Sequence, residues 1–453
     1  MERYKLIGSY LITELESKKE TNKTIVYVPL LNNNGELIYD IHKSYMKLLD
    51  SNLFPNEDAL DLLCLAMLVY LADTRISREL HSQDSWSREI EIELPVYNLE
   101  YFTQCSNTFQ IMLNFLTGDF WNINFTKKEK AYINIQQLNL ELDDDYDHVT
   151  LFSGGMDSLI NVINHLERKD KIILVSHAGD SFTKNAQKNI LQVLKEEYSE
   201  SKLLYFDIWM VFEKNFIPRG GNDNTTRSRS FLFIAYGIFI STSMKNINVL
   251  EVPENGLIAL NIPLDPLRIG SHSTRTTHPF YFENWIKIVN IFFKDFNIIN
   301  SYYNKTKGEM AIECLNTEFL LKIINKSVSC SSISKARWKG VEAQHCGYCV
   351  PCIIRRSAMQ KAFGVGKDKT EYTAKNISEI LTEHSGSMGI QLRSFQLAVK
   401  KITKNPESAK FLIHKTGPLN GDDEYLSQLE GVYVRGLLEV NDFIEENLLF
   451  GDI

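Results

Sequence analysis

The chain lacks an excess of positive charge and lacks a long apolar run. It holds 49 lysine and arginine residues against 57 aspartate and glutamate residues, a formal net charge of -8. Enzymes that bind duplex DNA or tRNA usually carry a basic surface, so nucleic acid is not expected as the main partner. The longest apolar run extends from Leu62 to Ala72, which is far shorter than the ~20 residues that span a bilayer. It predicts a buried helix, and no membrane association is expected.

A secretory leader and a set of disulfides are not expected either. The apolar patch from Leu6 to Ile12 is interrupted by Gly8 and leads to no small-residue cleavage site. The cysteines number seven, an odd count, and four of them gather late in the chain. This grouping favours a metal site in a reducing compartment and predicts a cytoplasmic protein. Cys64 and Cys105 lie in apolar helical contexts and are expected in the core.

The 453 residues allow two or three domains. Residues 1–146 are predicted to form an accessory α/β domain, because strand-like alternation and helical spacing follow each other there. Residues 147–365 alternate apolar strands with helices, which predicts a doubly wound, mainly parallel sheet. Residues 366–453 are predicted to be a C-terminal helical extension. The expected strands are 90–96, 121–125, 149–152, 171–178 and 202–208, and the expected helices are 58–74, 102–116, 159–166, 184–197 and 426–444.

A glycine turn joins the predicted strand 149–152 to the helix after it. The turn reads Ser153-Gly154-Gly155-Met156-Asp157-Ser158. No lysine follows the glycines, which excludes the phosphate loop of kinases and GTPases. Glycines permit close backbone approach to phosphates, the serine hydroxyls are donors, and Asp157 can orient the loop or bind Mg²⁺. An ordinary turn with a capping serine or aspartate is the alternative, but the full six-residue pattern favours phosphate binding.

A second pattern places three thiols on one tight turn, at Cys346, Cys349 and Cys352. A redox dithiol needs two thiols, so the triplet favours a structural zinc ion over redox chemistry or plain buried cysteines. Cys330 is the first candidate for the fourth ligand, which makes 330–352 the expected zinc-binding subdomain. His345 and Cys314 are alternatives.

The glycine loop resembles the pyrophosphate loop (PP-loop) of enzymes that split ATP into AMP and pyrophosphate. Together with the cysteine triplet, it resembles 7-cyano-7-deazaguanine synthases over about Val149 to Phe363. Four further segments resemble that family: the stretch around Arg229, the stretch around Lys307, Ser329-Cys330 and Arg355-Arg356. The gap between Cys330 and Cys346 is longer than in those synthases.

The resemblance implies an adenine nucleotide α-hydrolase-like fold that uses ATP, Mg²⁺ and Zn²⁺. It implies catalytic roles for Asp157 and Lys307. The nucleotide would be bound by Ser153, Gly154, Gly155, Asp157, Ser158 and Arg229. Residues 271–278, rich in hydroxyls, would bind a deazaguanine carboxylate such as 7-carboxy-7-deazaguanine through Arg275, Thr277 and His278; a solvated loop is the alternative. The ligands of zinc would be Cys330, Cys346, Cys349 and Cys352.

The added ends of the chain resemble synthase-like proteins of bacterial anti-phage (antiviral) defence operons, the Qat type in particular. That likeness implies an ATP-dependent ligase that makes an amide, a nitrile or a deazaguanine conjugate on a co-encoded partner protein. A tRNA-modifying PP-loop enzyme, a thiolase or a lysidine-type synthetase, is one alternative. A nucleotide-binding defence scaffold without catalysis is another.

Overall fold

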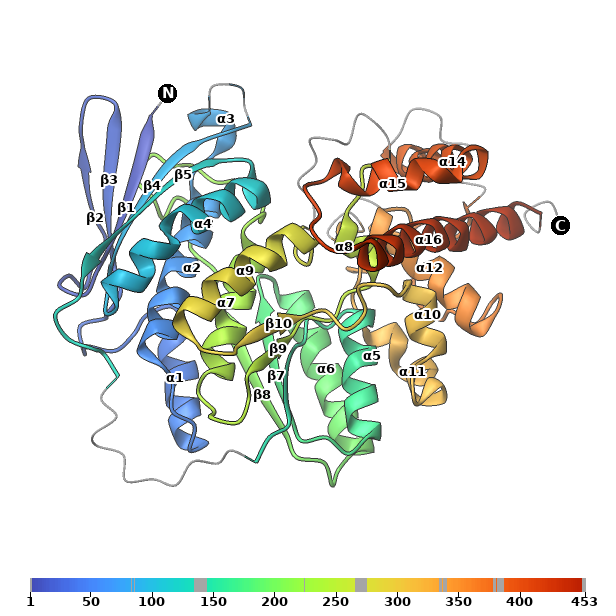
Figure 1. The fold of residues 1–453 in the computed structure, drawn as a ribbon, viewed down its shortest axis with the longest axis horizontal. Coiled ribbons are helices and arrows are strands. Elements are labelled where there is room, and N and C mark those ends of the chain that lie inside the picture. The colour runs from blue at the N-terminus through green and yellow to red at the C-terminus, as the bar shows by residue number, and fades with distance from the viewer. Residues whose placement is uncertain are drawn as a thin grey trace.

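Two five-stranded sheets and the helices around them make a mixed α/β fold (Figure 1). The structure is a computed structural model, and it describes residues 2–133, 145–264, 275–333, 336, 340–377, 380 and 387–449, apart from 83, 85 and 224. The seven cysteines are all free thiols. Within the described ranges, the helices are either too short or too polar to cross a membrane.

The first sheet has the order β2-β3-β1-β4-β5, in which only β2 runs antiparallel to its neighbour. Its strands are β1 (Arg3–Ser9), β2 (Glu16–Lys19), β3 (Lys23–Pro29), β4 (Glu89–Val96) and β5 (Phe120–Lys127). The helices of this part are α1 (Ile41–Asp50), α2 (Glu57–Arg75), α3 (Arg78–His81) and α4 (Leu99–Thr117). In β4 the isoleucines are buried and the glutamates lie on the outer face, where Lys5 pairs with Glu91 and Glu93. The alternation predicted for this strand is confirmed.

The second sheet is entirely parallel and has the order β10-β9-β6-β7-β8. Its strands are β6 (His148–Leu151), β7 (Ile172–Ala178), β8 (Leu203–Trp209), β9 (Val249–Glu251) and β10 (Asn297–Ile299). Along the chain, β7 and β8 are added in turn on one side of β6, and β9 and β10 are then added on its other side. Ligands of open α/β sheets bind beyond the carboxyl ends of the strands at such a reversal.

Helices cover both faces of this sheet. On one face α5 (Met156–Glu167) and α6 (Ser181–Glu197) share a hydrophobic cluster with Phe152, Ile172 and Leu174. On the other face α7 (Arg229–Ser241) and α9 (Pro279–Phe292) pack in a second cluster with the alternate residues of the strands. Gly237 lets α7 approach closely, because a Cβ there would lie 2.7 Å from the Leu250 side chain.

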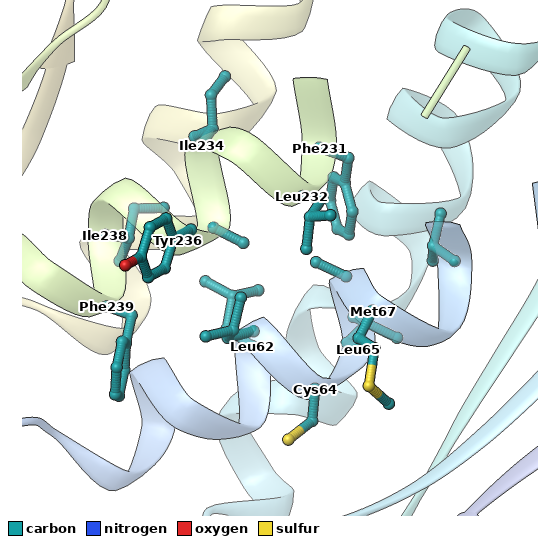
Figure 2. Packing of buried hydrophobic residues seen from close by; sticks show 14 of the residues in the cluster. Leu62, Cys64, Leu65, Met67, Phe231, Leu232, Ile234, Tyr236, Ile238 and Phe239 are labelled. Carbon is teal, nitrogen blue, oxygen red and sulfur yellow. The ribbon is translucent and has the colours of Figure 1, made fainter. Parts of the chain in front are cut away.

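The helix α2 lies between the two sheets, and every residue from Ala59 to Thr74 is buried. Figure 2 shows Leu62 and Leu65 of α2 pointing toward α7, while Cys64 points to the opposite side. One continuous cluster of buried side chains therefore contains residues of both sheets. The buried helix predicted from the Leu62–Ala72 run is confirmed, and so is the burial of Cys64 and Cys105.

The remaining helices lie beside the second sheet (Figure 1). A third cluster of buried side chains joins α8 (Gly256–Leu260), α12 (Val350–Phe363), α14 (Ser387–Lys404), α15 (Ala409–Leu412) and α16 (Asp423–Leu449). The helices α10 (Lys307–Ile312) and α11 (Thr317–Ile323) pack instead in the cluster of α5 and α6. The apolar stripe predicted for the last helix is confirmed, because Leu429, Leu437 and Val440 of α16 are buried. The domain boundaries at 146 and 365 remain predictions.

Candidate functional site

The predicted glycine loop joins β6 to α5 at the carboxyl end of β6. Gly154 has φ +80°, a left-handed conformation that glycine adopts without strain. Gly155 is the N-cap of α5, and its N–H donates to the Ser153 hydroxyl at 3.2 Å. The Ser158 hydroxyl lies 3.2 Å from that of Ser153. The loop therefore gathers two hydroxyls at a helix N-terminus, which favours anions.

A cavity of about 690 Å³ opens in front of this loop. Among the described residues, its wall includes the loop serines, three arginines and one carboxylic acid: Ser153, Ser158, Arg227, Arg229, Arg275 and Glu254. These side chains come from four separate segments of the chain. Asp157 and Lys307 are not among the described lining residues and stand behind the wall. The surplus of guanidinium groups suits an anionic ligand.

Arg229 is the first residue of α7, and its guanidinium is held by His177 at the end of β7. Its Nε donates to His177 Nδ1 at 3.3 Å and its Nη2 donates to the His177 carbonyl at 3.2 Å. Burial and the neighbouring guanidinium hold the pKa of His177 well below its ordinary value. His177 is thus neutral, which lets its ring nitrogen accept from Arg229.

The N-terminal part of the chain fixes the start of α7. Asp73 of α2 accepts from the backbone N–H of Ser228 at 2.8 Å and from its hydroxyl at 2.9 Å. The other Asp73 oxygen accepts from Arg78 and Arg88, both at 2.9 Å. Since Ser228 lies between Arg227 and Arg229, this buried network positions both cavity arginines.

Asp157 and Lys307 form a buried ion pair with Oδ1 and Nζ 2.6 Å apart. Asp157 Oδ2 accepts from the Asn255 backbone N–H at 3.1 Å and from its side chain at 2.8 Å. Both carboxylate oxygens of Asp157 therefore accept hydrogen bonds from protein groups. The pair joins the glycine loop to α8 and α10.

Glu254 adds an acid to the cavity wall. Burial is the largest cause that raises the pKa of this carboxyl to about 7, and the negative charge of Asp157 adds to it. The Thr277 hydroxyl donates to Glu254 and opposes the shift. Thr277, expected on the substrate side, therefore lies in the cavity wall bound to Glu254.

Of the other predicted substrate residues, Arg275 lines the cavity. Its guanidinium lies over the Phe115 ring at 4.6 Å and donates to the Phe115 carbonyl at 2.5 Å, while its Nε has no partner among the described residues. His278 caps α9 through Phe280 N–H at 3.2 Å and is not among the described lining residues. Burial and Arg275 lower the pKa of His278 to about 3. Residues 271–274 of the predicted loop lie outside the described residues.

The four predicted zinc ligands come together. The ligand atoms of Cys330, Cys346, Cys349 and Cys352 all lie within 4.8 Å of one another, with Sγ–Sγ distances of 3.9 Å for Cys330–Cys349 and for Cys346–Cys352. A tetrahedral zinc ion with Zn–S bonds of about 2.3 Å needs sulfur atoms about 3.8 Å apart. Backbone N–H groups donate to Cys330 and Cys346, as thiolates require. The cluster could hold zinc.

The two alternative ligands have other roles. Cys314 donates to the Asn316 carbonyl, away from the cluster. His345 Nε2 accepts from the Ser329 N–H at 3.1 Å. Ser329 follows Val328, whose N–H donates to the Gly154 carbonyl at 2.8 Å. The cysteine cluster thereby anchors the segment that holds the glycine loop.

The helix α16 reaches the site through Glu439, which the sequence reasoning treated only as part of a packing helix. Its carboxylate accepts from the Thr306 hydroxyl at 2.6 Å and from the Gly308 N–H at 3.1 Å, on either side of Lys307. The sequence feature that could have identified Glu439 is an acidic residue directly beside the apolar stripe of this helix. Arg227 lies in the predicted stretch around Arg229 but had no assigned role, and no role was predicted for Glu254.

Comparisons with known proteins assign no family. No protein-family model matches the chain, and no curated protein matches it. Among solved structures, a ketoreductase domain from the bacillaene assembly line aligns with 71% of this chain and 85% of its own, at 7% identity and a TM-score of 0.25. A likeness at this TM-score carries no argument.

Proposed function

We propose that this protein is a doubly wound PP-loop enzyme that uses ATP to activate a small carboxylic acid as an acyl adenylate. A deazaguanine carboxylate such as 7-carboxy-7-deazaguanine is the proposed acid. The observation that carries the proposal is the Ser153–Ser158 loop, which opens into a cavity lined by Arg227, Arg229 and Arg275 at the strand-order reversal. The reversal at β6 supports the doubly wound description.

The ATP phosphates would lie against the loop. The Gly155–Ser158 end of α5 offers backbone N–H groups and a partial positive charge, and Ser153 and Ser158 offer hydroxyl donors. Arg229 faces the same cavity and can stabilise negative charge that grows on the departing pyrophosphate. Lys307, paired with Asp157, would position the loop from the side that faces away from the cavity. No step is assigned to Mg²⁺ through Asp157.

The carboxylic acid would lie toward Arg275, whose guanidinium lines the cavity. A carboxylate oxygen attacks the α-phosphorus, a new P–O bond forms, and the bond to the β-phosphate oxygen breaks to release pyrophosphate. An amine then attacks the acyl carbon, and AMP leaves with the oxygen that made the attack. The amine would come from ammonia or from a co-encoded defence protein, giving an amide or a conjugate.

Zinc would serve as a structural crosslink in this proposal. Bound by Cys330, Cys346, Cys349 and Cys352, it would fix the segment that Val328 joins to the loop. The residues that act on the ligands are then the loop serines and the cavity arginines. Their work is positioning and electrostatic stabilisation.

The test uses the purified full-length protein with ATP, an ammonium salt as the amine source, and 7-carboxy-7-deazaguanine carrying heavy oxygen in its carboxylate. The expected products are AMP and pyrophosphate, formed only when the acid is present, with one heavy oxygen transferred into AMP. Ser158→Ala should slow pyrophosphate release by about 10- to 100-fold, because a hydrogen bond to a charged group is lost. Ser201→Ala is the matched control, since Ser201 lies before β8 at the opposite edge of the sheet.

Formation of ADP and phosphate, or AMP without heavy oxygen, would overturn the adenylation. Equal rates for Ser158→Ala and the unaltered protein would overturn the placement of ATP. Nucleotide binding without turnover would support the scaffold alternative. Intact-mass spectrometry of a co-expressed partner then distinguishes a protein acceptor from ammonia.

A further inference from the structure

A cluster of histidines and carboxylates lies at the amino-terminal end of β6, opposite the end that carries the glycine loop. His148 is the first residue of β6, and His165 lies near the end of α5. Asp170 stands in the turn before β7, and Glu251 ends β9. These residues take no part in the proposed ATP chemistry, and His148, His165 and Asp170 hold their ligand atoms within 4.8 Å of one another.

The carboxylate of Asp170 lies near both histidines of the cluster. Its Oδ2 lies 2.8 Å from His165 Nδ1 and 3.7 Å from His148 Nε2. The two imidazole rings lie side by side, with centroids 4.4 Å apart. The ring nitrogens of both histidines thus face one carboxylate oxygen, which is how two imidazoles and a carboxylate surround a metal ion.

Glu251 stands behind His165 as a second carboxylate, with Oε2 2.7 Å from His165 Nε2. A metal-binding histidine usually donates its other N–H to a carboxylate in this way, which fixes the ring and its tautomer. The other ring nitrogen, Nδ1, faces Asp170 Oδ2 and can hold a metal ion or a proton there.

We propose that His148, His165 and Asp170 form a second metal site, for a divalent transition ion such as zinc. Two imidazoles and a carboxylate suit such an ion, and the two carboxylates of the cluster would balance its charge. The side chains of His148 and Asp170 are 38% and 22% exposed, so an ion can enter from solvent. The other ring nitrogen of His148, Nδ1, lies 3.7 Å from Glu251 Oε1, so Glu251 faces both imidazoles. Three protein ligands leave at least one position for water or another ligand.

A proton competes with the metal ion for the position between His165 and Asp170. A doubly protonated His165 could bridge Asp170 and Glu251 without any ion, and the experiment must separate these two states. It uses untagged full-length protein, so that no added histidines bind metal. Zinc content is measured by mass spectrometry after dialysis against a weak chelator, and binding of added Zn²⁺ is followed by calorimetry.

We expect two zinc ions per chain in the unaltered protein. His148→Ala and Asp170→Asn should each retain one, held by the cysteine cluster. Cys349→Ser should retain the other. Glu251→Gln should weaken the second site by about 10- to 100-fold, as loss of an outer carboxylate does elsewhere. His414→Ala is the matched control, because His414 is exposed and distant in the chain.

Cobalt gives a second measurement that does not depend on zinc content. Co²⁺ in the cysteine cluster shows intense thiolate charge-transfer absorption, whereas Co²⁺ bound by imidazole and carboxylate adds only weak visible bands. The weak bands should disappear in His148→Ala while the thiolate absorption stays. A single metal ion per chain in the unaltered protein would overturn the proposal, and so would a second equivalent that survives in both His148→Ala and Asp170→Asn. His165 would then be a proton bridge.

Discussion

Replacing Glu439 tests whether the last helix holds the functional site together. Glu439→Ala removes the acceptor of the Thr306 hydroxyl and the Gly308 N–H, and it leaves the Lys361 ammonium, 3.2 Å away, without this partner. Glu439 is 4% exposed. Each hydrogen bond to a buried charge stabilises by about 1.5–3 kcal/mol. Lys361 is partly exposed and adds little. At the lower end of that range, the two bonds together give the start of α10 about 3 kcal/mol of local stability, which the substitution should remove.

Hydrogen exchange measures this loss where it occurs. A change of about 3 kcal/mol corresponds to about 100-fold faster exchange of the amides that open locally. Peptides that cover residues 303–313 should show that increase in Glu439→Ala and a smaller one in Glu439→Gln, which keeps one carbonyl acceptor. Pyrophosphate release, if the proposed activity holds, should fall together with the protection. Glu445→Gln, an exposed residue of the same helix, is the control. Unchanged exchange in the 303–313 peptides of Glu439→Ala would refute the reasoning.

Three further outcomes are expected. Cys349→Ser, or removal of zinc by a strong chelator, should destabilise the segment around Val328, because the binding energy of a structural zinc ion contributes to folding. Amide hydrogen exchange in that segment should become faster. Equal exchange rates with and without metal would contradict this. Gly256→Ala should lower the melting temperature by several degrees, because a Cβ would lie 2.0 Å from the Tyr303 carbonyl oxygen, and an unchanged melting temperature would contradict it. The pKa of Glu254 is raised to about 7 in the folded protein, so the folded state holds its proton to a higher pH than the unfolded chain does. The free energy of unfolding of the unaltered protein should therefore fall by about 3 kcal/mol, relative to Glu254→Gln, as the pH rises from about 4.5 to about 7. Above about pH 7 no further loss is expected. Denaturant unfolding at about pH 5 and about pH 8 checks the sign, and an equal difference at both would refute it.

Local patterns in the sequence predicted the elements that depend on neighbouring residues. The glycine loop, the strand before it and the helix after it lie within about twenty residues, and all three form as predicted. The cysteine triplet predicted a metal cluster for the same reason, since its spacing alone brings the thiols together. The strand β1 was missed because Gly8 and Ser9 interrupt its apolar pattern. The strands β9 and β10 have 3 residues each, too few to show a period.

The contacts that hold the segments of the cavity wall in place could not be predicted in this way. Glu439 and Thr306 are 133 residues apart in the sequence, and Asp73 and Ser228 are 155 residues apart. Such contacts depend on how the helices pack, which no local pattern reports. Even Asp157, found in the expected loop, faces Lys307 and Asn255 rather than open space, because two other segments approach it from behind.

The burial of α2 on both sides has a consequence for synthesis of the chain. During translation α2 leaves the ribosome long before α7, so its outward apolar face has no partner while the second sheet is still being made. A nascent chain at this stage exposes an apolar surface that is prone to aggregation and that chaperones bind. We therefore expect a fragment ending near residue 146 to aggregate when expressed alone, and to become soluble when residues 147–453 are supplied as a separate chain.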